Sequence, residues 1–235
     1  MNERASRGNL DELAEPGASP RPEPGGVTLR RYRHQIRNEL QLLTSLHALH
    51  VRRVDDPRAR HELIRCYRRV GVVGVVHQLT ADAGGIVGAD TCLNTVADFL
   101  EACARTMEGH DSLELHLDFE ALSWRHDHAT RIALVVDELF ANAMDHAVPQ
   151  ASKPQLDMSL KIIDSRACLS LRDYGPGIAP DLDPTTGDTL GLPMAAAVAQ
   201  QLGGAIELLA AEGGGTEARL WLPLELSVPE QEASS

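Results

Sequence analysis

Apolar residues in the first third of the chain recur every three or four positions, which is the spacing of one face of an α-helix. One such repeat covers residues 27–54 and a second covers residues 57–80, with a short Asp-Asp-Pro sequence between them. We therefore predict two helices folded back on each other as an antiparallel hairpin over residues 27–82. Because two helices cannot enclose a core, the hairpin should form a four-helix bundle with a second copy or pack against the rest of the chain.

The pattern changes after residue 90, where helical spacing alternates with short strand-like segments. The predicted helices are 91–107, 128–146 and 192–202, and the predicted strands are 113–119, 156–163, 166–172, 205–210 and 217–222. Two pairs of strands are close enough in sequence to form hairpins, so we expect an α+β fold, an α/β sandwich of helices on a mixed sheet, over residues 91–225. The small residues of ADAGGIVGAD, residues 81–90, predict a linker between the two domains.

Composition limits what the chain can do. Residues 1–26 are rich in Pro, Gly, Glu and Arg, and we expect them and residues 226–235 to be disordered tails. The formal net charge of −12, from 22 basic and 34 acidic residues, argues against nonspecific binding to nucleic acid or to an anionic membrane. No apolar run reaches the roughly 20 residues of a membrane span, and the N-terminus lacks the apolar core of a signal peptide. We therefore expect a cytoplasmic protein.

Three polar residues stand in register on an otherwise apolar helix. In LVVDELFANAMDHA, residues 134–147, Glu138, Asn142 and His146 follow one another at steps of four and so lie along one side of the helix. Pairs of this kind are common on exposed helix surfaces, where they only contact solvent. The alternative is a binding site, and three further segments favour it.

Each further segment combines glycine with a polar residue or with a helix start. LSLRDYGPGIA is a strand that ends at Asp173 and continues with Gly175 and Gly177, whose backbone lets a ligand approach closely. GDTLGLPMAAAVAQQLGG leads into a helix whose free N–H groups favour a phosphate. GGGTEARLWLP places Thr216 on a closing strand. The Asp-x-Gly-x-Gly pattern alone is more often a plain turn, and each segment is a weak signal by itself, so the fixed order of all four is the informative feature.

In this order the four segments resemble the ATP-binding domain, of the Bergerat type, that sensor histidine kinases share with DNA gyrase, the Hsp90 chaperones and the MutL repair proteins. The match is most specific for the N, G1 and G2 boxes of histidine kinases. The resemblance implies that Asn142 ligates a Mg²⁺ ion bridging the phosphates of ATP, that Glu138 orders the metal or a water molecule, and that Asp173 accepts a hydrogen bond from the adenine amino group. The other implied nucleotide-binding residues are His146, Gly175, Gly177, Leu190, Gly191, Leu192 and Thr216.

Two positions depart from that family's pattern. Asp145 stands where a lysine usually follows the asparagine by three places, and Thr189 replaces the middle glycine of the Gly-x-Gly-Leu-Gly sequence. The segment from Ile178 to Leu190 also contains three aspartates and no lysine or arginine. Because little positive charge then faces the phosphates, we expect modest ATP affinity that depends strongly on Mg²⁺.

The first helix carries a histidine that such a site would explain. In RHQIRNELQLL, residues 33–43, His34 and Asn38 lie opposite the apolar stripe, so we expect both to be exposed. His47 and His50 lie on the apolar side, where we expect them to pack. A lone exposed histidine usually has no special role, although a neutral imidazole is a competent nucleophile toward a phosphoryl group.

This helix resembles the phosphoacceptor and dimerisation helix of the histidine kinase subfamily whose motif is His-Arg-x-x-Asn, and residues 28–80 cover that domain. Gln35 replaces the arginine, and Glu39 stands where a second asparagine is usual. The resemblance implies that His34 and Asn38 take part in catalysis. Gln35 cannot accept a proton, so Glu39 and Glu138 are the candidates that could take it from the imidazole.

Together these features predict a dimeric, ATP-dependent histidine kinase. His34 would attack the γ-phosphate of Mg²⁺-bound ATP, and the phosphoryl group would pass to an aspartate of a response-regulator receiver domain in two-component signalling. The chain has no room for a sensor domain, so we expect an upstream sensor or regulator protein as a partner. The alternatives are a histidine phosphotransfer protein with a degenerate ATP site, which Asp145 favours, an anti-sigma-factor serine kinase, and a nucleotide-binding scaffold.

Overall fold

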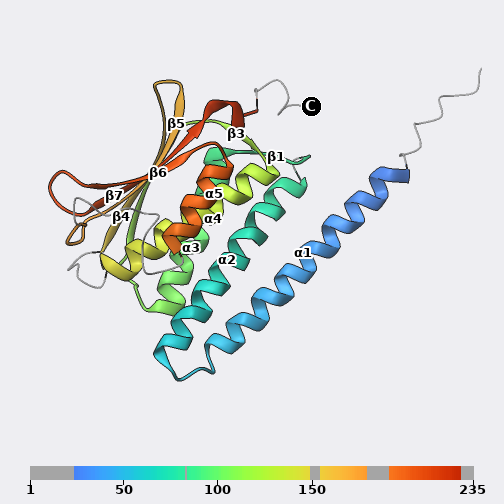
Figure 1. Ribbon diagram of the computed structural model, residues 1–235. Helices are drawn as coiled ribbons and strands as arrows, with labels where there is room; N and C mark the ends of the chain where they lie inside the picture. Colours follow the sequence, from blue (N-terminus) through green and yellow to red (C-terminus); the bar gives the residue numbers. More distant parts are fainter. Residues whose placement is uncertain (1–23, 83, 149–153, 179–190, 229–235) are drawn as a thin grey trace, which may run out of the picture.

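A computed structural model describes residues 24–82, 84–148, 154–178 and 191–228 as two long helices followed by a mixed α+β unit (Figure 1). In the first helix the backbone is described from residue 24, and the side chains from residue 35 onward apart from Arg37. The predicted exposure of the His34 side chain, the role of Leu190 and the predicted tail at residues 1–23 therefore lie outside the described residues.

The first two helices, α1 (Pro24–Val51) and α2 (Pro57–Asp82), run antiparallel, as predicted (Figure 1). Each begins with proline, which suits the first helical turn because an N–H group there has no partner within the helix. Asp56 caps α2, since its Oδ1 accepts a hydrogen bond from the backbone N–H of Ala59 at 2.8 Å. Helix α1 begins three residues before the predicted start of the hairpin.

The second unit places its helices on one face of a five-stranded sheet (Figure 1). Its helices are α3 (Ala89–Cys103), which continues as a π-helical turn η1 (Ala104–Glu108), α4 (His126–His146) and α5 (Gly191–Gln201). Its strands are β2 (Glu114–Phe119), β4 (Gln155–Ile163), β5 (Arg166–Asp173), β6 (Ala205–Ala210) and β7 (Thr216–Pro223), in the order β2-β4-β5-β7-β6. Only the β2–β4 pair is parallel, so the predicted α+β fold with a mixed sheet is confirmed.

The sequence pattern did not predict a small second sheet. The strands β1 (Ile86–Gly88) and β3 (Ser123–Arg125) pair antiparallel and bury Trp124. Strands of three residues are too short to show a period, which is why residues 81–90 read as a linker. At the C-terminal end, a 3₁₀ turn η3 (Leu224–Leu226) leads to Ser227, which bridges to Trp124, so the chain is ordered past the predicted domain end.

The hairpin is not separate from the α+β unit. Val72 and Val76 of α2 are fully buried in the same core as α3 and α4, and α2 lies alongside α4 (Figure 1). Helix α1 packs on α2 instead. Among the described helices, none has an apolar stretch that could cross a lipid bilayer.

Candidate active site

Asp173 stands at the end of β5 with its carboxylate fixed by the backbone. The side chain is buried, and its Oδ1 accepts hydrogen bonds from the N–H groups of Gly175 at 2.9 Å and Thr216 at 3.0 Å. The second of these bonds comes from the first residue of β7, so two neighbouring strands orient one carboxylate. This brings together three of the residues predicted at the nucleotide.

Close backbone packing explains the glycines around Asp173. A Cβ atom at Gly175 would lie 2.5 Å from the Cβ of Ala147, at the end of α4. At Gly215, which has φ of +87°, it would lie 2.0 Å from the backbone oxygen of Asp173. Both positions therefore require glycine, and Gly215 was not singled out by the sequence. The end of α4, the end of β5 and the start of β7 thus meet at one place.

Along α4, the three polar residues at steps of four differ in exposure. Glu138 is buried, Asn142 is partly buried and His146 is exposed. Gly191, the first residue of α5, packs closely against the side chain of Glu138. A Cβ atom at Gly191 would lie 2.5 Å from Glu138 Oε2. All three polar residues, with Gly191 and Leu192, line one small cavity, so the predicted N-box and G2-box residues come together.

Two arginines of α2 bind Glu138. Arg65 Nη2 lies 3.0 Å from Glu138 Oε2, and Arg69 Nε lies 2.6 Å from Glu138 Oε1. This contact could not be predicted from the sequence, because arginines on α2 are typical of the solvent side of a helix and the ion pairs span about 70 positions of sequence. Glu138 is therefore a neutralised carboxylate and not a free one.

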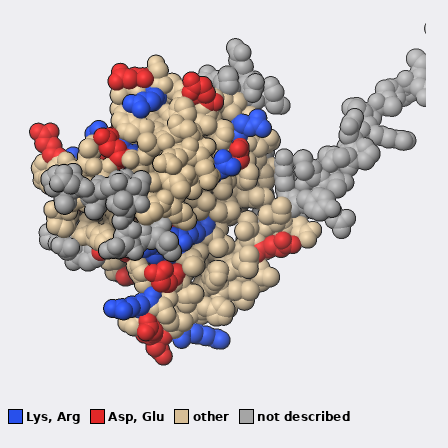
Figure 2. All heavy atoms as spheres, viewed as in Figure 1, with Lys and Arg blue, Asp and Glu red and all other residues tan. Residues whose placement is uncertain are grey.

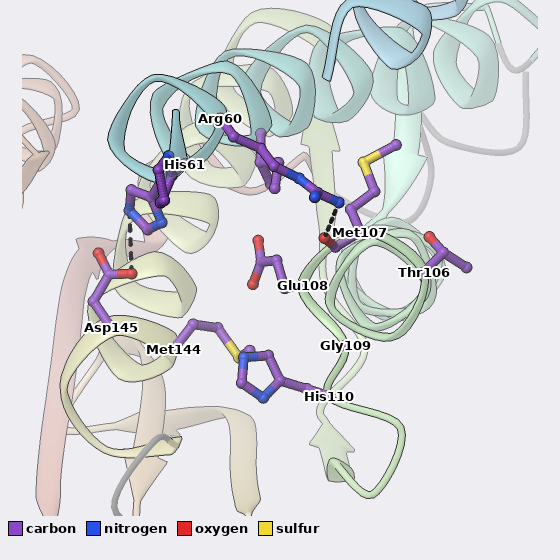
Figure 3. Close-up of a pocket in the computed structure, with 11 residues that line it drawn as sticks. Arg60, His61, Thr106, Met107, Glu108, Gly109, His110, Met144 and Asp145 are labelled. Carbon is purple, nitrogen blue, oxygen red and sulfur yellow. Dashed lines mark hydrogen bonds and ion pairs between the residues drawn. The ribbon is translucent and has the colours of Figure 1, made fainter. Parts of the chain in front are cut away.

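Asp145, which stands where a lysine was expected, is also held by α2. Its Oδ2 lies 3.4 Å from Arg65 Nη1, and its Oδ1 lies 3.3 Å from His61 Nε2 (Figure 3). Asp145 and His61 border a cavity of about 650 Å³ between the start of α2, η1 and the end of α4, where Arg60 also donates to the carbonyl oxygen of Met107 (Figure 3). The aspartate that stands in place of the expected lysine at position 145 is thus bound by Arg65 and His61 of the hairpin.

A third contact between α2 and the α+β unit is fully buried. Arg68 Nε lies 3.0 Å from Asp137 Oδ1, and Arg68 Nη1 lies 2.6 Å from Glu108 Oε1. Burial raises the pKa of Asp137 to about 6, and the nearby Arg68 offsets only part of that effect. Burial lowers the pKa of Arg68, but Asp137 and Glu108 outweigh it and leave that pKa raised. This pairing fixes α2 against α4.

Around the predicted phosphoacceptor, the described side chains are exposed, and all of them except Ile36 are polar. Asn38 is exposed, as expected, and Gln35 Nε2 donates to Glu39 Oε1 at 3.0 Å. His47 is partly buried, whereas His50 is exposed, so the expectation that His50 packs was wrong. Leu40, Thr44 and His47 follow the partly buried side of α1, which leaves the side bearing His50 open.

Position 34 of α1 is far along the hairpin from Glu138. Leu40 packs opposite Gly74, so position 34 of the antiparallel α1 lies level with the end of α2, near Thr80. Glu138 is bound by Arg65 and Arg69, which precede Thr80 by 15 and 11 positions. At 1.5 Å per helical residue, the two levels are roughly 16–22 Å apart. Glu138 therefore lies far from position 34 of the same chain in this arrangement.

Two known protein families match this chain. Residues 32–104 match a phosphoacceptor family described as "Histidine kinase", and residues 127–226 match the family "Histidine kinase-, DNA gyrase B-, and HSP90-like ATPase". Together the two matches span most of the chain. The chain belongs to the histidine kinases. The predicted ATP-binding fold and the prediction of an ATP-dependent histidine kinase are confirmed at the level of the family.

Individual histidine kinases resemble this one over most of its length. It is 27% identical to the sensor histidine kinase PdtaS of Mycolicibacterium smegmatis and 26% identical to PdtaS of Mycobacterium tuberculosis, each over 84% of this chain. It spans 40% of the length of those relatives. The histidine kinase domain of the Erythrobacter litoralis blue-light activated kinase EL346 shares the fold, with 20% identity and a TM-score of 0.61 over 85% of this chain and 96% of that one.

The kinase offers few protein ligands for a metal. Among the described residues, no three His, Cys, Asp or Glu side chains gather in a way that could hold an ion. Asn142 and Glu138 supply amide and carboxylate oxygens, which suit Mg²⁺, an ion that binds proteins through one or two such groups and takes its remaining ligands from phosphates and water. The predicted donor types fit Mg²⁺ as the partner of a nucleotide, but both oxygens of Glu138 are bound by Arg65 and Arg69, so Glu138 could ligate the ion only after one of these arginines moves away.

Proposed function

We propose that this chain is a kinase that transfers the γ-phosphoryl group of Mg²⁺-bound ATP to His34. The observation that carries the proposal is the meeting of three predicted nucleotide-binding segments around α4. Glu138 and Asn142 face the start of α5, while Asp173 and Gly175 meet the end of α4 at Ala147. A nucleotide recognised at Asp173 would therefore extend its phosphates along α4 toward Asn142.

The adenine base would be recognised by Asp173. The two backbone N–H groups hold the carboxylate through Oδ1, so Oδ2 is the oxygen that would accept a hydrogen bond from the adenine amino group. A buried carboxylate that is already oriented makes such a bond without losing further freedom, and a bond to a charged group is stronger than a neutral one. Thr216, Gly175 and Gly177 shape the walls next to it.

The phosphates would lie beside Asn142, His146 and the first turn of α5 at Gly191 and Leu192. A helix start presents free N–H groups to an anion. Mg²⁺, when bound, neutralises charge on the phosphates and orders them, and Asn142 and Glu138 would hold it. These metal and nucleotide roles stay predictions, as do the bounds of the domains and a cytoplasmic location.

His34 would be the nucleophile, forming a P–N bond as the bond to ADP breaks. Of the two carboxylates that could take the imidazole proton, Glu39 lies on the same helix, one turn and a half from His34, and it accepts a hydrogen bond from Gln35. Glu138 lies at a distant level of the hairpin. This separation argues against Glu138 and leaves Glu39 as the candidate, on a different side of the helix from position 34. Asn38, four positions after His34, is the closer neighbour on the helix surface.

A second copy of the chain is the expected partner of α1. Its large apolar side chains that remain exposed are Ile36, Leu42, Leu43, Leu46 and Leu49. In Figure 2 the described part of α1 carries few charged side chains on the side that is seen. Such an apolar helix surface favours a homodimeric four-helix bundle. A receiver domain would then take the phosphoryl group from His34, and a sensor or regulator protein would supply the signal.

Incubation with γ-labelled ATP and Mg²⁺ tests this function. We expect an acid-labile, alkali-stable label on the protein, lost in His34→Ala and strongly reduced in Asn142→Ala. His50→Ala is the matched control, because His50 is an exposed histidine of the same helix. A protein that takes label only from a phosphorylated receiver domain would instead be a histidine phosphotransfer protein.

A further inference from the structure

The guanidinium of Arg65 binds two carboxylates of α4, one before and one after Asn142 along the helix. Nη2 of Arg65 binds Glu138, four residues before Asn142, and Nη1 binds Asp145, three residues after it. Both carboxylates lie on the side of the helix that also presents Asn142. Arg65 is mostly buried, and it lines the same small cavity as Asn142, His146 and Gly191. Among the described residues that line this cavity, Arg65 is the only lysine or arginine.

Without α2, the nucleotide-facing side of α4 would repel ATP. Glu138 and Asp145 are acidic residues that line the small cavity, and position 145 lacks the positive charge that the resemblance implies there. Every lysine or arginine that pairs with these two carboxylates among the described residues comes from α2. These are Arg65 and Arg69, and His61 of the same helix also contacts Asp145. The positive charges that neutralise the carboxylates of the site therefore come from the hairpin.

We propose that Arg65 binds the phosphates of ATP and supplies, from α2, the positive charge that Asp145 removes from α4. Arginine suits this role because its planar fork presents parallel N–H groups that match a phosphate in a bidentate way. Asp145, held at one end by His61, positions the fork, and Arg69 remains to neutralise Glu138. This inference rests on the proposed function, because it requires the nucleotide to lie at Asn142.

One consequence is that the hairpin takes part in nucleotide binding. Arg65 reaches the site only while α2 lies against α4, where the buried pair of Arg68 and Asp137 holds it. ATP affinity therefore depends on the position of α2, the helix that packs against the helix of His34. A signal that moves the hairpin would change ATP affinity without touching the ATP-binding unit itself.

The test compares Mg²⁺-ATP and adenosine binding by calorimetry and by NMR titration in the full chain. Arg65→Gln removes the charge but keeps a polar side chain of similar length. We expect it to weaken Mg²⁺-ATP binding by roughly 10- to 100-fold, the loss typical of a hydrogen bond to a charged group, and to leave adenosine binding unchanged. Arg65→Lys should recover part of the loss, because it keeps the charge but not the fork.

Arg60→Gln is the matched control. Arg60 is a cation on the same helix that contacts the carbonyl of Met107 and no residue of the phosphate site, so it should leave both affinities unchanged. Tighter or equal binding of Mg²⁺-ATP to Arg65→Gln would overturn the proposal, and tighter binding would show that Arg65 competes with the nucleotide. Failure of the wild-type chain to bind either ligand would instead refute the proposed function.

Discussion

Individual carboxylates in this molecule have different surroundings and therefore different roles. Asp173 is oriented by two backbone N–H groups, Asp137 is buried against Arg68, and Glu138 and Asp145 are bound by α2. Three of them lie on one helix, and Asp173 stands at the end of a strand. Only the three-dimensional partners separate a base-recognising carboxylate from a structural one.

Asp173→Asn should remove adenine recognition and keep the fold. Asparagine retains one oxygen for the N–H groups of Gly175 and Thr216, but its amide N–H₂ then faces the adenine amino donor. We expect Mg²⁺-ATP affinity to fall by roughly 10- to 100-fold in calorimetry, with an unchanged thermal unfolding midpoint. Asp164→Asn, in the exposed turn between β4 and β5, is the control. Equal ATP affinity in wild type and Asp173→Asn would contradict the assigned role.

Asp137 should leave a signature in the pH dependence of stability. Its pKa is about 6 in the folded chain, above its ordinary value of 3.8. Between these values the folded state binds a proton that the unfolded state does not, so this residue makes the free energy of unfolding fall as pH rises from about 4 to 6, by roughly 3 kcal/mol. Urea unfolding of Asp137→Asn should lack this fall. Parallel pH profiles for the two proteins would show that Asp137 does not titrate in this window.

The sequence pattern predicted whole helices and strands closely, but it did not predict the contacts between them. The period of apolar residues located α2, α4, β4 and β7 to within one or two residues, because each buries one regular face. The same pattern brought Glu138, Asn142 and His146 to one side of α4. It could not reveal the arginines of α2 that bind α4, since a salt bridge between distant helices has no period.

Among the individual helices, α1 has the exposed apolar side that most needs a partner. Leu42→Glu combined with Leu49→Glu should convert a dimer into a monomer, because two buried charges without partners are costly at an apolar interface. Sedimentation equilibrium measures the change. Asn94→Glu with Ala102→Glu adds the same charge to the exposed side of α3 and should leave the dimer intact. A wild-type monomer, or a dimer that survives the leucine substitutions, would refute this interface.

Along the axis of the hairpin, position 34 and Glu138 are separated by roughly 16–22 Å. A dimer with a two-fold axis along the bundle would place the partner's His34 at the same level, so pairing alone does not bring it closer. The arrangement therefore suits nucleotide binding, and phosphoryl transfer requires the hairpin and the α+β unit to change position. The sequence could not predict this separation, because it indicated that His34 and Glu138 belong to the site but not how far apart they lie.

Linking α2 to η1 should separate binding from transfer. Arg60→Cys with Met107→Cys, in a Cys66→Ser background, places two thiols where α2 and η1 meet (Figure 3). After joining by a short bismaleimide, the protein should bind Mg²⁺-ATP normally but lose labelling of His34 by about tenfold or more. The same variant treated with N-ethylmaleimide should keep its labelling. Undiminished labelling of the linked protein would show that transfer occurs in the described arrangement.

The most direct measurement is the location of the phosphate after incubation with Mg²⁺-ATP, mapped by mass spectrometry under alkaline conditions. We predict a single phosphate on the imidazole of His34, absent from Asn142→Ala. Phosphate on a serine or threonine, or on another histidine such as His50, would contradict the account, and so would a protein that gains no phosphate from ATP at all.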